Sequence, residues 1–142
     1  MLTPEAVTAI VSDGGFKRVL LVGGDKAVSN SVRGQLGDGF TYVRAGGSDR
    51  YQTSLKMAEF ATANGLGWQN PLVATGRDFA DALSGAAPAG KLGSLILIVD
   101  DTGKTAADEI SRHGSEVKHV HVLGGTAAVP QSVTDSLDSA LS

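Results

Sequence analysis

The chain has 142 residues, enough for one domain with a continuous hydrophobic core. Hydrophobic residues make up 42% of it, charged residues 19%, and the formal net charge is −3, which excludes the disordered and strongly basic classes. No run of Lys or Arg exceeds two residues, so nucleic acid and anionic membranes are not expected as bulk electrostatic partners.

Short apolar runs alternate with helix-length segments along the chain. The expected strands are Arg18–Gly24, Phe40–Gly47, Leu72–Gly76, Leu95–Val99 and His119–Gly125. The expected helices are Ser29–Leu36, Asp49–Asn64, Phe79–Leu92, Lys104–His113 and Pro130–Leu141. This alternation predicts an α/β fold: a doubly wound, mainly parallel sheet of about five strands with helices on both faces, as in Rossmann and flavodoxin-like domains.

The sequence also repeats itself. The stretch RVLLVGGDKAVSNSVRGQL, residues 18–36, recurs as HVHVLGGTAAVPQSVTDSL, residues 119–137, with eight identities in nineteen positions. Strand, turn and helix stay in register. We therefore expect residues 1–142 to form a single module, namely one period of a tandem array plus the tail of the preceding period.

The glycine pairs Gly23-Gly24 and Gly124-Gly125 close strands shortly before helices. One interpretation is an anion site at the following helix N-terminus. The sequence GGDKAV matches neither nucleotide-binding glycine motif, and tight turns that need positive φ explain the pairs more simply.

The segment 73–92 opens a helix behind a strand. Asp78 is placed to cap this helix, and Asp81 lies in its first turn, where both carboxylates complement the helix dipole. As a catalytic pair they lack a His or Lys partner nearby. The helix consists largely of small residues, which suits burial against a second subunit, and Pro88 is expected to bend or end it.

The segment GGSDRYQTS, residues 46–54, opens the preceding helix. Asp49 or Ser48 is expected to cap it, whereas Arg50 in a first turn opposes the helix dipole. Arg50 should therefore pair with Asp78 or Asp81, Asp81 being preferred, or face a ligand. Both loops follow strand C-termini, the edge at which open α/β sheets bind ligands.

Metal and cofactor sites are not expected. His119 and His121 alternate along one predicted strand and His113 could join them, but no fourth ligand is evident. Asp100-Asp101-Thr102-Gly103 is interpreted as a polar turn that caps the next helix.

Cysteine is absent, which excludes disulfides and thiolate metal sites and suits an exported bacterial protein. No stretch approaches the ~20 apolar residues of a membrane span, and the residues after Met1 do not form a signal peptide. The chain is therefore expected to be cytosolic or a module of a longer exported protein.

Four ordered motifs, GGSDRYQTS (46–54), VATGRDFADALSG (73–85), LILI (95–98) and LGGTAAV (123–129), together resemble the cell wall binding repeat 2 family. The resemblance covers nearly the whole chain from Arg18 onward. It implies a non-catalytic, extracellular module that tethers an exported bacterial protein to the cell wall by binding anionic secondary cell-wall polymers. Family members carry the module in tandem, typically three times, and the three copies form a compact trimer-like unit.

Carried over by position, the family's motif residues are Asp49, Arg50, Tyr51, Thr53, Thr75, Gly76, Phe79, Asp81, Gly124 and Gly125. The family's polymer-attachment stretch, Pro-Ile-Leu-Leu, falls on Leu95, Ile96, Leu97 and Ile98, where the proline is missing and the last leucine is isoleucine. We expect Arg44, Arg50, Arg77 and Lys91 to cluster near these motifs as the basic groups of the site.

The predicted partners are an anionic cell-wall polymer and other copies of the module, in a homotrimer or an intramolecular trimer. Two alternatives stay open. One is a flavodoxin-like nucleotide-binding or enzymatic domain, for which the sequence offers neither a phosphate loop nor an acid/base constellation. The other is a self-associating structural domain without a ligand.

Overall fold

The structure, a computed structural model, describes residues 5–142. Its strands are β1 (Arg18–Val22), β2 (Thr41–Ala45), β3 (Leu72–Thr75), β4 (Ile96–Val99) and β5 (His121–Leu123). Its helices are α1 (Glu5–Asp13), α2 (Ser31–Leu36), α3 (Arg50–Ala63), α4 (Ala80–Lys91), α5 (Lys104–Arg112) and α6 (Gln131–Leu141). Every expected element is present, and α1 precedes them.

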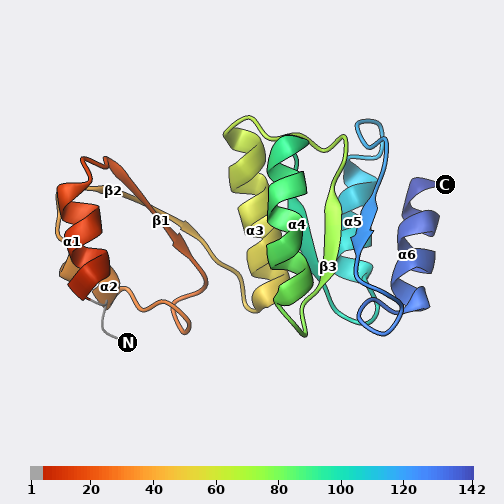
Figure 1. The fold of residues 1–142 in the computed structure, drawn as a ribbon, viewed down its shortest axis with the longest axis horizontal. Coiled ribbons are helices and arrows are strands. Elements are labelled where there is room, and N and C mark those ends of the chain that lie inside the picture. Colours follow the sequence, from red (N-terminus) through yellow and green to blue (C-terminus); the bar gives the residue numbers. More distant parts are fainter. Residues whose placement is uncertain (1–4) are drawn as a thin grey trace.

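All strand pairs are parallel, which confirms the α/β class, but the five strands divide into two sheets. β1 pairs with β2, and the other sheet has the order β4-β3-β5. In a flavodoxin-like order β1 would lie beside β3, and here β5 takes that edge. Residues 5–45 therefore form an N-terminal lobe to one side of a body that starts at α3 (Figure 1).

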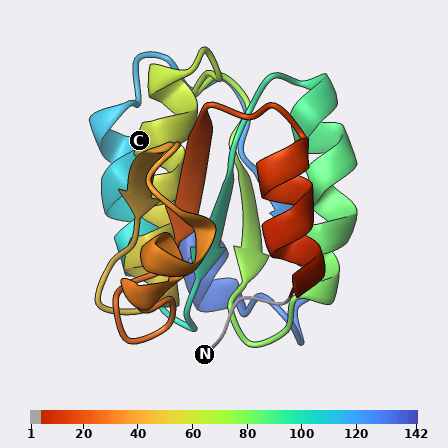
Figure 2. The same ribbon diagram turned by 90° about the vertical axis from the view of Figure 1, so that its left-hand side faces the viewer.

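The body is layered. Figure 2 shows α3 and α5 on one side of the strands and α4 on the other. The main core joins α3, α5 and α6 to the sheet face that carries Val73, Leu97 and Val99. Leu97, Val73, Ile110 and Val133 have no accessible surface, so this face supplies most of the hydrophobic stabilisation.

Helix α4 lies close to the opposite face of the sheet because of a glycine. A Cβ atom on Gly85 would overlap the Leu123 side chain of β5, so a larger residue would push helix and strand apart. The helix also continues through Pro88 to Lys91. Of the two alternatives, that Pro88 bends or ends the helix, the second is wrong. The missing N–H removes a single i→i−4 hydrogen bond, and the helix continues for its final turn.

The glycine pairs form the tight turns that their sequence favours. Gly23 and Gly124 adopt φ of 121° and 103°, values that L side chains rarely take. In each turn the amides three and four residues on donate to the carbonyl of the second glycine, Gly24 or Gly125. These amides are thus used within the turn, which favours the structural interpretation over an anion site.

The outer edge of β4 is protected by a side chain from α3. Ser54 is 6% exposed, and its hydroxyl accepts a hydrogen bond from the Ile98 N–H at 2.9 Å. An unpaired strand N–H would otherwise be left beside the core, at a cost of about 1–3 kcal/mol. This bond also fixes the start of α3 against the sheet.

Candidate functional site

The two motif loops meet at the carboxyl ends of the strands, as the sequence predicts. The Arg50 guanidinium of α3 donates a hydrogen bond to the Gly76 carbonyl, just past the end of β3. Gly76 also lies against the side chains of Arg50 and Tyr51, so a Cβ at this position would crowd both. The loop that opens α3 and the loop that opens α4 therefore form one surface.

The expected ion pair of Arg50 with Asp78 or Asp81 is wrong. No ion pair within residues 5–142 joins Arg50 to either carboxylate. The Asp81 carboxylate instead lies beside Gly124, where it would crowd a Cβ. Arg50 bonds to the Gly76 carbonyl instead, because this carbonyl lies between the starts of the two helices. The arginine remains exposed.

Three carboxylates at or just before the helix starts accept hydrogen bonds from nearby backbone amides. Asp49 accepts from the Gln52 N–H at 2.7 Å, and Asp78 accepts from the Ala80 N–H at 3.1 Å. Asp100 accepts from the hydroxyl and N–H of Thr102 and from the Gly103 N–H. The Thr102 hydroxyl bond and these amides lower the pKa of Asp100, partly opposed by burial. The predicted cap by Asp49 is confirmed. Asp78 and Asp100 are not N-caps, because the N-cap positions of α4 and α5 are Phe79 and Gly103, and the two aspartates bond to amides from the turns that lead into these helices.

A cavity of about 570 Å³ separates the N-terminal lobe from the body, and we call it the inter-lobe cavity. Its walls come from the turn after β1, the start of α3, and Ala82, Ile96 and Ile98 of the body. Lys26, Asp49 and Arg50 supply its charges. The cavity is therefore an apolar cleft with two cationic side chains and one carboxylate.

A second cavity of about 330 Å³ lies on the other side of Arg50, and we call it the Arg77 cavity. Arg50, Ala82 and Ile98 line both cavities. The Arg77 cavity adds Thr75, Gly76, Arg77, Asp78 and Phe79. Arg50 thus stands between two adjoining hollows at the carboxyl edge of the strands, the usual ligand edge of an open α/β sheet.

Arg77 and Arg44 differ in how far contacts within the protein occupy their guanidinium groups. Arg77 pairs with Asp101 across the loops after β3 and β4, and both side chains are more than half exposed. Such exposed pairs are weak, so a ligand anion could compete for Arg77. Arg44 is held by the Gly23 carbonyl, by Asn30 and by Asp25, and its side chain is 23% exposed. Its contacts fix the turn after β1 and leave little charge for a ligand.

Two further predicted groups are divided by the structure. Lys91 is the last residue of α4. At a rise of 1.5 Å per residue it lies roughly 16 Å from the start of that helix. The expectation that Lys91 clusters with the three arginines is therefore wrong. In the LILI stretch Leu95 and Leu97 are buried in the core, whereas Ile96 and Ile98 face the inter-lobe cavity. Alternation along a strand accounts for this split.

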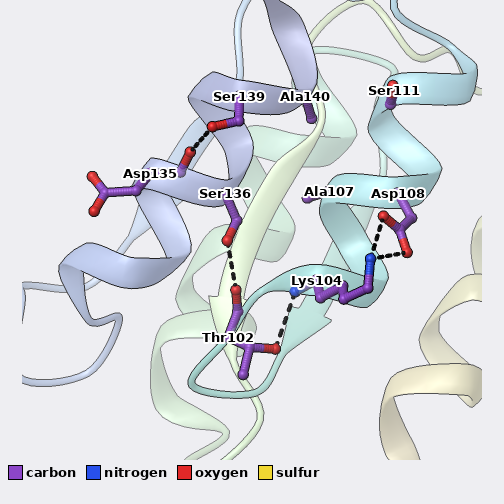
Figure 3. A pocket seen from close by; sticks show the side chains of 9 residues that line it. All are labelled: Thr102, Lys104, Ala107, Asp108, Ser111, Asp135, Ser136, Ser139 and Ala140. Atoms are coloured by element: carbon purple, nitrogen blue, oxygen red, sulfur yellow. Dashed lines mark hydrogen bonds and ion pairs between the residues drawn. The ribbon is translucent and has the colours of Figure 1, made fainter.

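A groove of about 540 Å³ between α5 and α6 is a weaker candidate (Figure 3). Its polar groups bond to one another: Lys104 bonds to Asp108, and the Ser136 hydroxyl donates to the Thr102 carbonyl. Asp108 and Asp135 leave a net negative lining once Lys104 is counted. This lining would repel an anionic ligand.

The histidines are dispersed. His113 stacks on Trp68 with ring centroids 4.1 Å apart, and His119 lies before β5 rather than within it. The described part of the chain holds no group of three His, Cys, Asp or Glu side chains that could bind a metal ion. Among the helices of residues 5–142, none has the length and apolar character needed to cross a membrane.

Comparison with known sequences decides the family. The profile of cell wall binding domain 2 (CWB2) matches residues 44–134, which include both motif loops and all three strands of the body. The chain belongs to the CWB2 family. It is thus a cell-wall binding module, and its place is the cell wall or cell surface.

Two curated relatives come from Bacillus subtilis (strain 168). N-acetylmuramoyl-L-alanine amidase LytC is 29% identical over 124 residues, covering 87% of this chain and 24% of LytC. The amidase enhancer is 30% identical over 122 residues, covering 85% of this chain and 17% of that protein. The CWB2 chain thus spans a quarter or less of each relative.

A solved structure with the same fold is Cwp6 from Clostridium difficile. It aligns with 96% of this chain and 22% of its own, at a TM-score of 0.80 and 22% sequence identity. This similarity supports the α/β fold described above.

Sequence reasoning missed several residues of the inter-lobe cavity, namely Val22, Lys26 and Met57. Lys26 could have been found, because it follows the first glycine pair at the carboxyl end of a predicted strand. Asp101, the partner of Arg77, had been placed only in a polar turn.

Proposed function

We propose that this CWB2 module binds an anionic cell-wall polymer without catalysis and so tethers an exported bacterial protein to its envelope. The observation that carries the proposal is the position of Arg50 between two adjoining cavities at the ligand edge of the sheet. Arg77 adds a second exposed guanidinium, and arginine suits bidentate binding of phosphate or carboxylate. Asp49 caps the helix that carries Arg50, and Asp81 lies beside the turn at Gly124.

The attraction must be local because the whole chain carries a net charge of −3. Ile96 and Ile98 would contact the apolar parts of the polymer, while Leu95 and Leu97 support them from the core. Individual contacts of this kind are weak, and several modules acting together would supply avidity.

Retention on intact cell walls should therefore fall as salt increases. Exposed charge contacts are screened over about 10 Å at 0.1 M salt and about 3 Å at 1 M. We expect several-fold less protein to sediment with purified walls at the higher concentration. Retention that is unchanged or stronger at high salt would show that apolar contacts, not the arginines, carry binding.

We also propose that the module associates with other copies as a trimer. Phe79, the N-cap residue of α4, and Leu83, Ala86 and Gly90 within the helix form an exposed face of apolar and small residues at helical spacing. Phe79 is 76% and Leu83 67% exposed, which is costly for large apolar side chains in water. A cyclic arrangement of identical copies would cover this face in each.

Light scattering should report about three chains per particle at micromolar concentration. Leu83→Lys should reduce the mass toward one chain, because a buried unpaired ammonium opposes the interface. Leu66→Lys is the matched control, since Leu66 is 37% exposed in the segment that follows α3. A monomeric parent chain, or equal loss of mass in both variants, would argue against α4 as the interface.

A further inference from the structure

Strands β1 and β5 are the same strand in two copies of one repeat. The order helix–strand–helix of α1–β1–α2 recurs as α5–β5–α6. Within the matched stretches Leu20 corresponds to His121, Leu21 to Val122 and Val22 to Leu123. Despite this equivalence, β1 is bonded to β2 and β5 to β3.

The two copies use opposite edges of this strand. In β1 the Gly23 N–H donates to the Ala45 carbonyl of β2 at 2.7 Å. In β5 the His121 N–H donates to the Pro71 carbonyl, just before β3, at 3.0 Å. Backbone groups of successive residues point to alternate edges, so Leu21 shares the edge of Gly23 and faces β2, whereas its counterpart Val122 faces away from β3. The edge that holds β2 in the first copy is thus the edge left open in β5.

Side-chain burial follows the same division. Leu21 is 6% exposed in the lobe, whereas its counterpart Val122 is 37% exposed. Conversely, Val133 on α6 is fully buried against the body, whereas its counterpart Val32 on α2 is only half-buried. The first copy thus has β2 beside its strand but no strand equivalent to β3, and the second copy has β3 but no strand equivalent to β2.

The chain's own β2 does not reach the open edge. The lobe that contains β2 lies at one end of the molecule, and α6, which follows β5, lies at the other (Figure 1). A separate copy of the chain also has its β2 already paired with its own β1. A β2-type strand can pair with the open edge without leaving another partner if its repeat copy has β5 as its first strand.

We infer that the open edge of β5 binds, in parallel, the β2-type strand of a further copy of the repeat that shares β5 as its first strand. The completed sheet has the order β4-β3-β5-β2, with two strands from each of two successive copies. The N-terminal lobe is, by the same logic, the part that completes the sheet of a preceding copy. Adjacent repeats are therefore joined by a continuous sheet, independently of polymer binding.

The inference fixes the register. Because Leu20 lies opposite Val43 and Leu21 opposite Arg44, His121 should lie opposite Val43 of the added copy, and Val122 opposite Arg44. A tandem protein tests this directly. It is made by continuing the chain from Leu137 into Gly37 of a second copy, since Leu137 and Leu36 are equivalent. The chain has no cysteine, so introduced cysteines report only on their own positions.

The first measurement is amide hydrogen exchange at Val122. It should be fast in the single chain and slowed roughly tenfold or more in the tandem protein, because the amide becomes hydrogen-bonded. Val43→Pro in the second copy keeps the carbonyl that accepts from Val122 but removes the N–H that would donate to the Val120 carbonyl, so the added strand should pair more weakly and exchange at Val122 should become faster again. The second measurement is disulfide formation. His121→Cys with Val43→Cys of the second copy should cross-link, and His121→Cys with Tyr42→Cys should not, because Tyr42 points to the other face.

Equal Val122 exchange in the single chain and the tandem protein, together with no His121–Val43 cross-link in a folded tandem protein, would overturn the inference. Exchange in the single chain that slows as its concentration rises would also overturn it, because a separate molecule would then cover the edge. Cross-linking of both cysteine pairs alike would refute the proposed register.

Discussion

Leu97→Ala is expected to lower the free energy of unfolding by about 2–5 kcal/mol, the usual cost of a cavity in a packed core. Leu97 has no accessible surface and lies in the cluster that joins α3, α5 and α6 to the sheet. The surrounding elements are fixed by the strand pairing on β3, so the site has little freedom to collapse. Chemical denaturation of wild type and variant measures the difference.

Ile98→Ala is the matched control, because the two side chains are neighbours on one strand and point to opposite faces. Ile98 is only half-buried and lines both cavities, so its loss should destabilise the fold less and reduce wall retention more than Leu97→Ala does. Equal destabilisation by the two substitutions would contradict the division of the LILI stretch into a core face and a cavity face.

Replacing Arg50 and Arg77 together by glutamine is expected to cause the largest loss of binding. A hydrogen bond to a charged group contributes about 1.5–3 kcal/mol to the free energy of an interaction. A change of about 1.4 kcal/mol in binding free energy corresponds to a tenfold change in affinity. Retention on walls should therefore fall by roughly a hundredfold or more if both arginines contact the polymer. Arg50 is exposed, so the loss of its hydrogen bond to the Gly76 carbonyl should change the melting temperature little.

The paired variant Lys56→Gln with Lys118→Gln removes the same charge from exposed positions outside both cavities. It should retain binding. Asp101→Asn, which releases Arg77 from its ion pair, should increase retention. If the lysine variant loses as much retention as the arginine variant, binding depends on overall charge, and the two cavities are not the site.

The fold was largely predictable because its signals are local. Continuous apolar runs, aspartate caps and glycine turns placed the strands, the starts of α3 and α5, and the meeting of the two motif loops. The division into two sheets was not predictable in this way. It depends on which of two equivalent strands, β1 or β5, pairs with β3, and that choice is made by non-local packing.

The charged contacts were predicted less well. The arginine side chain is long and flexible, so the predicted proximity of two loops does not determine which group its guanidinium binds. Arg50 binds a backbone carbonyl rather than Asp81, and Arg77 binds Asp101. The distance of Lys91 from the other basic residues follows from helix length alone and could have been foreseen.

The most direct test of cell-wall polymer binding is sedimentation of the purified protein with cell walls before and after chemical removal of the anionic secondary polymer. Walls from the organism that carries the protein are used at equal mass, and the unbound protein is measured in the supernatant. The account predicts strong retention on intact walls and little on stripped walls. Equal retention on both, or no retention on intact walls, would contradict it.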